Sequence, residues 1–215
     1  MTSTTAQTKS SDNGAHASGH SHNGDMPKIG MWVFLFTELI LFGTLFIAYA
    51  VYLEQYTKDF RIGSGMLNVP IGALNTLILL TSSLTMALSI AALARSKKKH
   101  CLILLAVTVL CAVMFLGIKS MEWGTKFHHH IYPKSELFAT WPKGQVVYFG
   151  LYYVMTGLHA LHVIVGSAVI LIAFVMVKKN RIRSDRIAFL ENTGLYWHLV
   201  DMIWIFLFPL FYLIG

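Results

Sequence analysis

The sequence predicts an all-α membrane protein, a polytopic bundle of five transmembrane helices. Only 13% of its 215 residues are charged, whereas soluble domains carry about 25%. It contains five apolar runs, each near or above the roughly 20 residues that cross a bilayer as a helix. Backbone groups in hydrocarbon must be hydrogen-bonded within their own segment, so these runs are expected to be helices rather than strands. The runs cover residues 30–53, 69–93, 101–119, 146–177 and 195–214.

The chain divides into a polar tail and one membrane domain. Residues 1–28 are rich in Ser, Thr, Gly and His, and lack the basic start and apolar core of a signal peptide. This composition predicts a disordered cytoplasmic tail. Residues 29–215 form the five-helix domain.

Two short segments mark where predicted helices begin. Asn68 and Pro70 supply a cap and a first-turn proline to the second helix. The segment 141–144 (Trp-Pro-Lys-Gly) interrupts the chain before the fourth helix. The fourth run is longer than a perpendicular crossing needs, so this helix is expected to tilt or to protrude.

Basic residues predict the orientation. The loops after the second and fourth helices contain Arg95, Lys97, Lys98, Lys99, Lys178, Lys179, Arg181, Arg183 and Arg186. On the other side lie Lys58, Arg61, Lys119, Lys126, Lys134 and Lys143. Cytoplasmic loops carry the excess of Lys and Arg, which predicts a cytoplasmic N-terminus and a periplasmic C-terminus. The net charge of +7 is therefore a topology signal and does not indicate a nucleic-acid partner.

Ionisable residues at membrane depth each cost roughly 2.5 kcal/mol or more and call for a reason. The candidates, all proton-active or structural, are Glu38, His159, His162, Glu191, His198 and Asp201. Glu38 lies about 12 Å into the membrane by helix rise, among Phe and Leu residues. Burial there favours the neutral acid. Glu38 is either a proton-active carboxyl or an acid bonded to a neighbouring helix.

His159 and His162 are three residues apart and share one face of the fourth helix. The spacing is compatible with metal or haem ligation, but haem ligands usually come from facing helices. We therefore expect both histidines to bond to neighbouring helices and to fix their packing. No metal site is predicted.

Glu191, His198 and Asp201 are spaced seven and three residues apart, and so share a face of the fifth helix. Asp201 near His198 would favour the charged imidazole, whereas burial opposes it. The sequence does not decide between these effects. The histidines of the tail (His16, His20, His22) and of the outer loop (His128, His129, His130) are weaker metal candidates.

Four stretches resemble one family of respiratory proteins. They are residues 31–38 (MWVFLFTE), 74–76 (LNT), 157–166 (GLHALHVIVG) and 196–201 (YWHLVD), and Glu122 before Trp123 also matches. In this order they resemble subunit III of the cytochrome c and quinol oxidases, which are haem–copper terminal oxidases. The resemblance covers nearly everything from Gly30 to the C-terminus.

The resemblance implies a helical subunit docked on catalytic subunit I and other oxidase subunits in the bacterial inner membrane. Haem and copper belong to the catalytic subunit, so no catalytic, cofactor-binding or metal residue is expected here. The family supports proton uptake, binds phospholipid and slows turnover-linked inactivation. Glu38 matches the family carboxyl that reacts with hydrophobic carbodiimides.

The chain departs from the seven-helix members and resembles the shorter five-helix bacterial form. The cleft that holds lipids against the first two helices of the longer form cannot be complete here. The electron donor, cytochrome c or quinol, is not distinguished, because the donor sites lie on other subunits.

Three other readings are the accessory subunit of a nitric oxide reductase, a small transporter and a dihaem cytochrome b. A transporter is disfavoured because the sequence shows no inverted repeat and no matching pair of broken helices. Haem absorbance of the isolated chain would identify a cytochrome b.

Orientation is testable with fusions. Tags at Met1 and within residues 95–99 are expected to be cytoplasmic, and alkaline phosphatase fused after Gly215 is expected to be active in the periplasm. An inactive fusion at Gly215 would contradict the orientation.

Overall fold

The computed structural model describes residues 26–128, 140–182 and 187–214, and within these ranges every regular element is an α-helix. Five helices are long and apolar enough to cross a membrane, which confirms the predicted fold class. They are α1 (Met26–Gln55), α3 (Val69–Ala94), α4 (Lys98–His128), α6 (Lys143–Lys178) and α7 (Ala188–Tyr212). The tail up to residue 25, most of the outer loop, Arg183, Arg186 and Gly215 lie outside the described residues.

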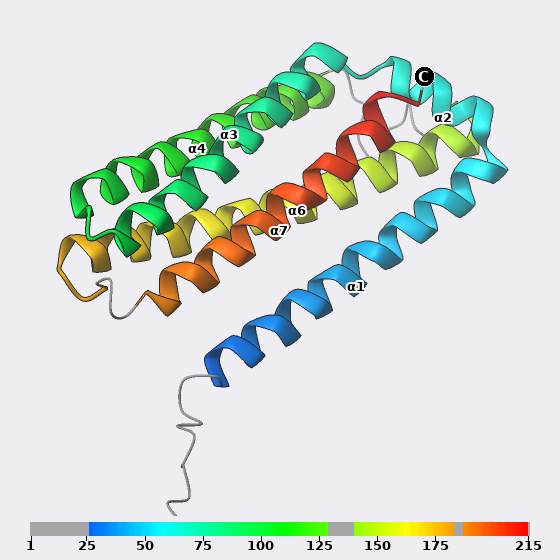
Figure 1. The fold of residues 1–215 in the computed structure, drawn as a ribbon. Helices are drawn as coiled ribbons and strands as arrows, with labels where there is room; N and C mark the ends of the chain where they lie inside the picture. The colour runs from blue at the N-terminus through cyan, green and yellow to red at the C-terminus, as the bar shows by residue number, and fades with distance from the viewer. Residues whose placement is uncertain (1–25, 129–139, 183–186, 215) are drawn as a thin grey trace, which may run out of the picture.

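Four of these helices form the core of the bundle. In Figure 1, α3, α4, α6 and α7 run side by side, whereas α1 leans away from them towards its N-terminal end. Only 6% of the most apolar stretch of α1 is buried within the protein, against 50% for α7. The core of the fold is therefore the α3–α4–α6–α7 bundle, and α1 is attached to its side.

A short helix that the sequence did not reveal, α2 (Thr57–Gly65), connects α1 to α3. Its one large apolar anchor, Phe60, is fully buried. The Phe60 ring packs edge-on against Tyr49 of α1 at 5.3 Å and Tyr148 of α6 at 5.2 Å between centroids. Through this side chain, and through Gly63 against the Tyr148 ring, α2 joins the end of α1 to the bundle.

The end of α4 differs most from the sequence prediction. The helix continues to His128, nine residues past the expected end at Lys119 (128 − 119 = 9). Lys119, the expected last residue of the helix, and Lys126, expected beyond its end, both lie inside this helix and are buried, with 4% and 8% of their surface exposed. The predicted end was wrong, because groups inside the bundle accommodate these charges.

The two basic loops lie at the same end of the bundle, as the orientation argument requires. Asn68 caps α3 as predicted, its side chain accepting from the Ile71 amide. At the opposite end of α3, the Lys98 ammonium donates to the Lys178 carbonyl at 2.9 Å and to the Asn180 side chain at 2.6 Å. The α3–α4 and α6–α7 connections are thus bonded to each other.

At Gly166, α6 packs closely against α7. A Cβ atom placed there would lie 2.9 Å from the Trp197 ring, closer than real Cβ atoms pack. The ring is fully buried and cannot move into solvent. The absence of a side chain at residue 166 therefore sets the spacing of these two helices.

We expect Gly166→Ala to destabilise the protein by about 1–3 kcal/mol, because the added methyl group overpacks against Trp197. Thermal unfolding of the detergent-solubilised protein measures the change. Gly150→Ala in the same helix is the matched control, because a Cβ there meets nothing within 4 Å. Equal melting temperatures for the two variants would refute the close-approach argument.

Candidate functional site: an intramembrane carboxyl–imidazole pair

Glu38 of α1 and His162 of α6 meet within the membrane span. Glu38 Oε2 lies 2.8 Å from His162 Nε2. Both side chains are largely enclosed, with 15% of Glu38 and 13% of His162 exposed. The structure thus joins two residues that are far apart in the sequence and that depth alone had singled out.

The contact of the other ring nitrogen of His162, Nδ1, shows which protonation states the pair can adopt. His162 Nδ1 lies 2.7 Å from the Leu158 carbonyl oxygen, which accepts hydrogen bonds and cannot donate them. Nδ1 therefore carries a hydrogen, and Nε2 faces Glu38 in either of two states. A neutral imidazole accepts from a protonated Glu38, and an imidazolium donates to the carboxylate. One proton is shared along this contact.

Aromatic side chains enclose the pair. The Phe42 ring packs edge-on against His162 at 5.4 Å, and the Tyr196 ring lies at 6.5 Å. The Tyr196 hydroxyl also donates to the His162 carbonyl at 3.3 Å. These contacts with Phe42 and Tyr196 hold the imidazole so that it faces α1. The Glu38–His162 pair is thus a polar contact that attaches α1 to the bundle.

His159 does not share this role. It is fully buried between the rings of Phe115, at 5.6 Å, and Trp204, at 5.2 Å. Neither ring nitrogen has a hydrogen-bond partner among the described residues. The expectation that both histidines bond to neighbouring helices is confirmed for His162 and wrong for His159. Because the two residues are three positions apart on α6, their side chains point in different directions. His162 faces α1, and His159 faces α4 and α7.

His198 and Asp201 each find a partner on α3 instead of pairing with one another. The Ser83 hydroxyl lies 2.6 Å from His198 Nδ1, and the Ser82 hydroxyl donates to Asp201 Oδ2 at 3.4 Å. Trp197 adds a third link, its indole N–H donating to the Ser82 oxygen at 3.1 Å. These contacts dock α7 on α3.

Glu191 stands apart from both serine contacts. With His198 and Trp32 it lines a cavity of about 490 Å³ between α1, α3 and α7. Of the three residues predicted to share a face of α7, Glu191 and His198 thus line the same cavity, and Asp201 points into the bundle core.

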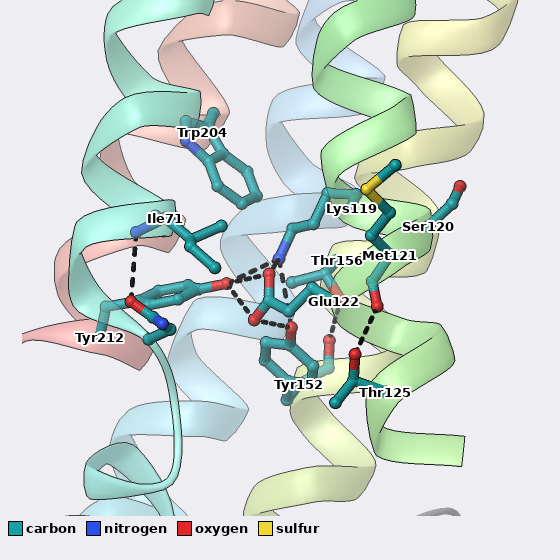
Figure 2. A network of polar contacts seen from close by, with 12 residues as sticks. Ile71, Lys119, Ser120, Met121, Glu122, Thr125, Tyr152, Thr156, Trp204 and Tyr212 are labelled. Atoms are coloured by element: carbon teal, nitrogen blue, oxygen red, sulfur yellow. Dashed lines mark hydrogen bonds and ion pairs between the residues drawn. The ribbon is translucent and has the colours of Figure 1, made fainter. Parts of the chain in front are cut away.

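The sequence analysis did not predict a second polar cluster, which forms around Lys119. Figure 2 shows the Lys119 ammonium held by three oxygens, those of Glu122 at 3.0 Å, Tyr212 at 2.7 Å and Tyr152 at 3.2 Å. Both tyrosine hydroxyls donate in turn to the Glu122 carboxylate, at 2.8 to 2.9 Å. The ammonium also lies 4.9 Å from the Trp204 ring. This cluster joins α4, α6 and α7.

The sequence held a signal for this cluster. Lys119 and Glu122 have the i,i+3 spacing of an intrahelical ion pair, which lets a helix continue through charged residues. Lys126, one turn further, packs over the rings of Tyr152 at 5.5 Å and Phe149 at 5.9 Å. The predicted helix ended near these charged residues, although their spacing and the neighbouring aromatics indicated that it continues.

The family model for cytochrome c oxidase subunit III matches residues 7–215. The chain belongs to this family. It is 31% identical to a probable quinol oxidase subunit 3 of Staphylococcus saprophyticus, over 91% of this chain and 92% of the relative. It is also 31% identical to cytochrome c oxidase subunit 3 of Alkalihalophilus pseudofirmus, over 87% and 86% of the two chains. With the cytochrome bo(3) ubiquinol oxidase subunit 3 of Pseudomonas aeruginosa the identity is 29%, over 94% and 93%.

Membership of the subunit III family makes this chain a multi-pass membrane subunit of a haem–copper terminal oxidase. Within its described ranges, the chain has no group of three or more His, Cys, Asp or Glu side chains arranged to hold a metal ion.

The Lys119–Glu122 pair is expected to be a main stabilising contact of this subunit. Lys119→Met or Glu122→Leu should each cost about 3–5 kcal/mol, because the remaining charge is buried without its counter-charge. The double variant should cost less than the sum of the two. Thermal unfolding of the purified protein measures all three changes.

Lys58→Met, at an exposed position of α2, is the control for loss of a lysine and should be close to neutral. Additive effects of the two single substitutions would contradict the pairing.

Proposed function

We propose that this chain is the non-redox accessory subunit III of a proton-pumping oxidase of aerobic respiration, in a bacterial inner membrane. Its role is to support proton uptake, stability and assembly of the catalytic subunit, which would hold the haem and copper. The relatives named above, all bacterial oxidase subunits, support the assignment. The observation that carries the proposed role is the Glu38–His162 pair.

The pair is suited to holding a proton within the membrane. Both groups can bind a proton, and their 2.8 Å contact permits its transfer without movement of either side chain. The rings of Phe42 and Tyr196 pack beside the imidazole, and only 13% of His162 and 15% of Glu38 are exposed, which limits exchange of the proton with the surroundings. A group of this kind, attached to the outside of the core bundle, could exchange a proton with an adjoining subunit.

The pair also has a mechanical role. Since α1 is scarcely buried, its position depends on a few specific contacts. Glu38 is bonded to α6, and the Tyr49 hydroxyl donates to the Leu210 carbonyl of α7 nearer the other end of α1. Loss of the first contact would remove the one polar attachment to α6 that the structure shows for the described residues of α1 and leave its N-terminal half held by apolar contacts such as Phe34 with Tyr196. We therefore link both proposed effects, on proton uptake and on stability, to the same pair.

The electron donor is left open by the relatives. The two at 31% identity are named as a quinol oxidase subunit and a cytochrome c oxidase subunit. Membrane lipids surround the chain in either case, and phospholipid is a further candidate ligand of the subunit.

Glu38→Gln tests the proposal in the assembled oxidase. Gln retains the shape and can still bond to His162, but it cannot ionise. We expect proton pumping or endurance during turnover to fall, with a smaller effect on the initial rate of electron transfer, because the redox centres would lie in another subunit. Pumping stoichiometry, turnover lifetime and initial oxygen consumption measure the three quantities.

Glu54→Gln is the matched control, an exposed acid on the same helix. A hydrophobic carbodiimide should modify Glu38 before Glu54, because the reagent partitions into hydrocarbon, where Glu38 lies. Wild-type pumping and lifetime in Glu38→Gln would restrict Glu38 to a packing role. Complete loss of haem reduction would refute the accessory-subunit assignment.

A further inference from the structure

Three polar side chains at the centre of the bundle lack hydrogen-bond partners for some of their atoms. Within the part of the chain that the structure describes, both ring nitrogens of His159, both amide atoms of Asn75 and Oδ1 of Asp201 are unpartnered. His159 and Asn75 are 0% exposed, and Asp201 is 3% exposed. The three come from α6, α3 and α7.

His159 packs directly on Trp204, and Asn75 and Asp201 come from nearby positions on the two helices that Trp204 joins. The His159 ring packs on the Trp204 ring at 5.2 Å between centroids. The Trp204 indole N–H donates to Thr76 at 3.1 Å, and Asn75 precedes Thr76 on α3. Asp201 is one helical turn before Trp204 on α7. Two other buried atoms without a hydrogen-bond partner among the described residues, Ser64 Oγ and Trp123 Nε1, lie on α2 and α4 and are not part of this group.

Because these side chains are buried, lipids and other subunits cannot supply the hydrogen-bond partners of their unpartnered atoms. A side chain that is 0% exposed can be reached neither by a lipid nor by another subunit. An unmade hydrogen bond on a buried polar group costs about 1–3 kcal/mol, and these side chains carry five such atoms. Water offers both donors and acceptors in the smallest volume, and buried water commonly bridges such groups.

We propose that the centre of the α3–α4–α6–α7 bundle binds ordered water, at His159, Asn75 and Asp201. The hydrated region lies between the Ser82–Asp201 contact on one side and the Lys119–Glu122 cluster on the other. Trp204 borders it, because this ring touches both His159 and the Lys119 ammonium. The proposal rests on residues of this chain alone and does not depend on the role of Glu38.

The chemistry of His159 fits a water ligand. The Lys119 ammonium and the His159 ring both pack on the indole of Trp204. A second positive charge, on His159, is therefore disfavoured. A neutral imidazole has one N–H donor and one acceptor nitrogen. Water can accept from the first and donate to the second. At Asn75 and Asp201, water can likewise donate to an oxygen and, at Asn75, accept from the amide.

Radiolytic footprinting in H₂¹⁸O tests the proposal on the assembled oxidase. Hydroxyl radicals formed from bound water add ¹⁸O to the nearest side chains, even where bulk solvent cannot reach. Phe115, which touches His159, and Phe211, which lies among tyrosine rings, are a matched pair, both 0% exposed. We expect label on Phe115 and Trp204 and background label on Phe211. Equal background labelling of Phe115 and Phe211 in the wild type would overturn the proposal.

Substitution of His159 gives a second measurement. His159→Phe removes both nitrogen ligands and should reduce the label on Phe115 to the level of Phe211. His159→Gln keeps a donor and an acceptor and should retain the label. The melting temperature should fall in His159→Phe if water is bound, because a bonded network is lost. A higher melting temperature in His159→Phe would show that the ring nitrogens were unpartnered in a dry core, contrary to the proposal.

Discussion

The hydrocarbon interior of the membrane offers no hydrogen bonds, and this constraint determines which helix faces meet in the subunit. A polar side chain at that depth must find its partner inside the protein. Some do so locally, as Thr44 and Ser120 do by donating to the carbonyls four residues earlier. Others reach a neighbouring helix, and each such contact specifies one pair of helix faces. The apolar residues fill the space between these contacts, with close fits at a few positions such as Gly166 against Trp197.

Hydropathy predicted the five long helices because their existence depends only on chain composition. It failed at the end of α4 for a physical reason. Lys119, Glu122 and Lys126 each count as a break in an apolar run when taken singly. In the folded protein, Lys119 and Glu122 satisfy each other, and aromatic rings cover both lysines. That compensation involves α6 and α7, which no local window includes. The short helix α2 was missed because it is only nine residues long and has a single large buried side chain, so it does not form an apolar run.

The candidate residues were identified from the sequence because they are ionisable side chains in or beside predicted membrane spans. Their partners could not be identified in this way, because these depend on how the helices are arranged. Glu38 and His162 each stood out as a cost within an apolar run, but nothing in the sequence indicated that α1 faces α6. The spacing of His159 and His162 identifies a shared face, yet three residues of helix rotation suffice to direct them to different neighbours. His198 and Asp201 likewise share a face of α7, and each instead bonds to a serine of α3.

The two serine contacts have a consequence for how α3 and α7 align. Ser82 and Ser83 are adjacent in the chain and bond to Asp201 and His198, which lie one turn apart on the opposing helix. Sliding α7 along α3 by one turn would separate both contacts and could re-form at most one of them, because it moves one of the two α7 side chains into the place of the other. The native alignment is the one in which both pairs form at once. The two contacts together therefore favour a single registry of these helices.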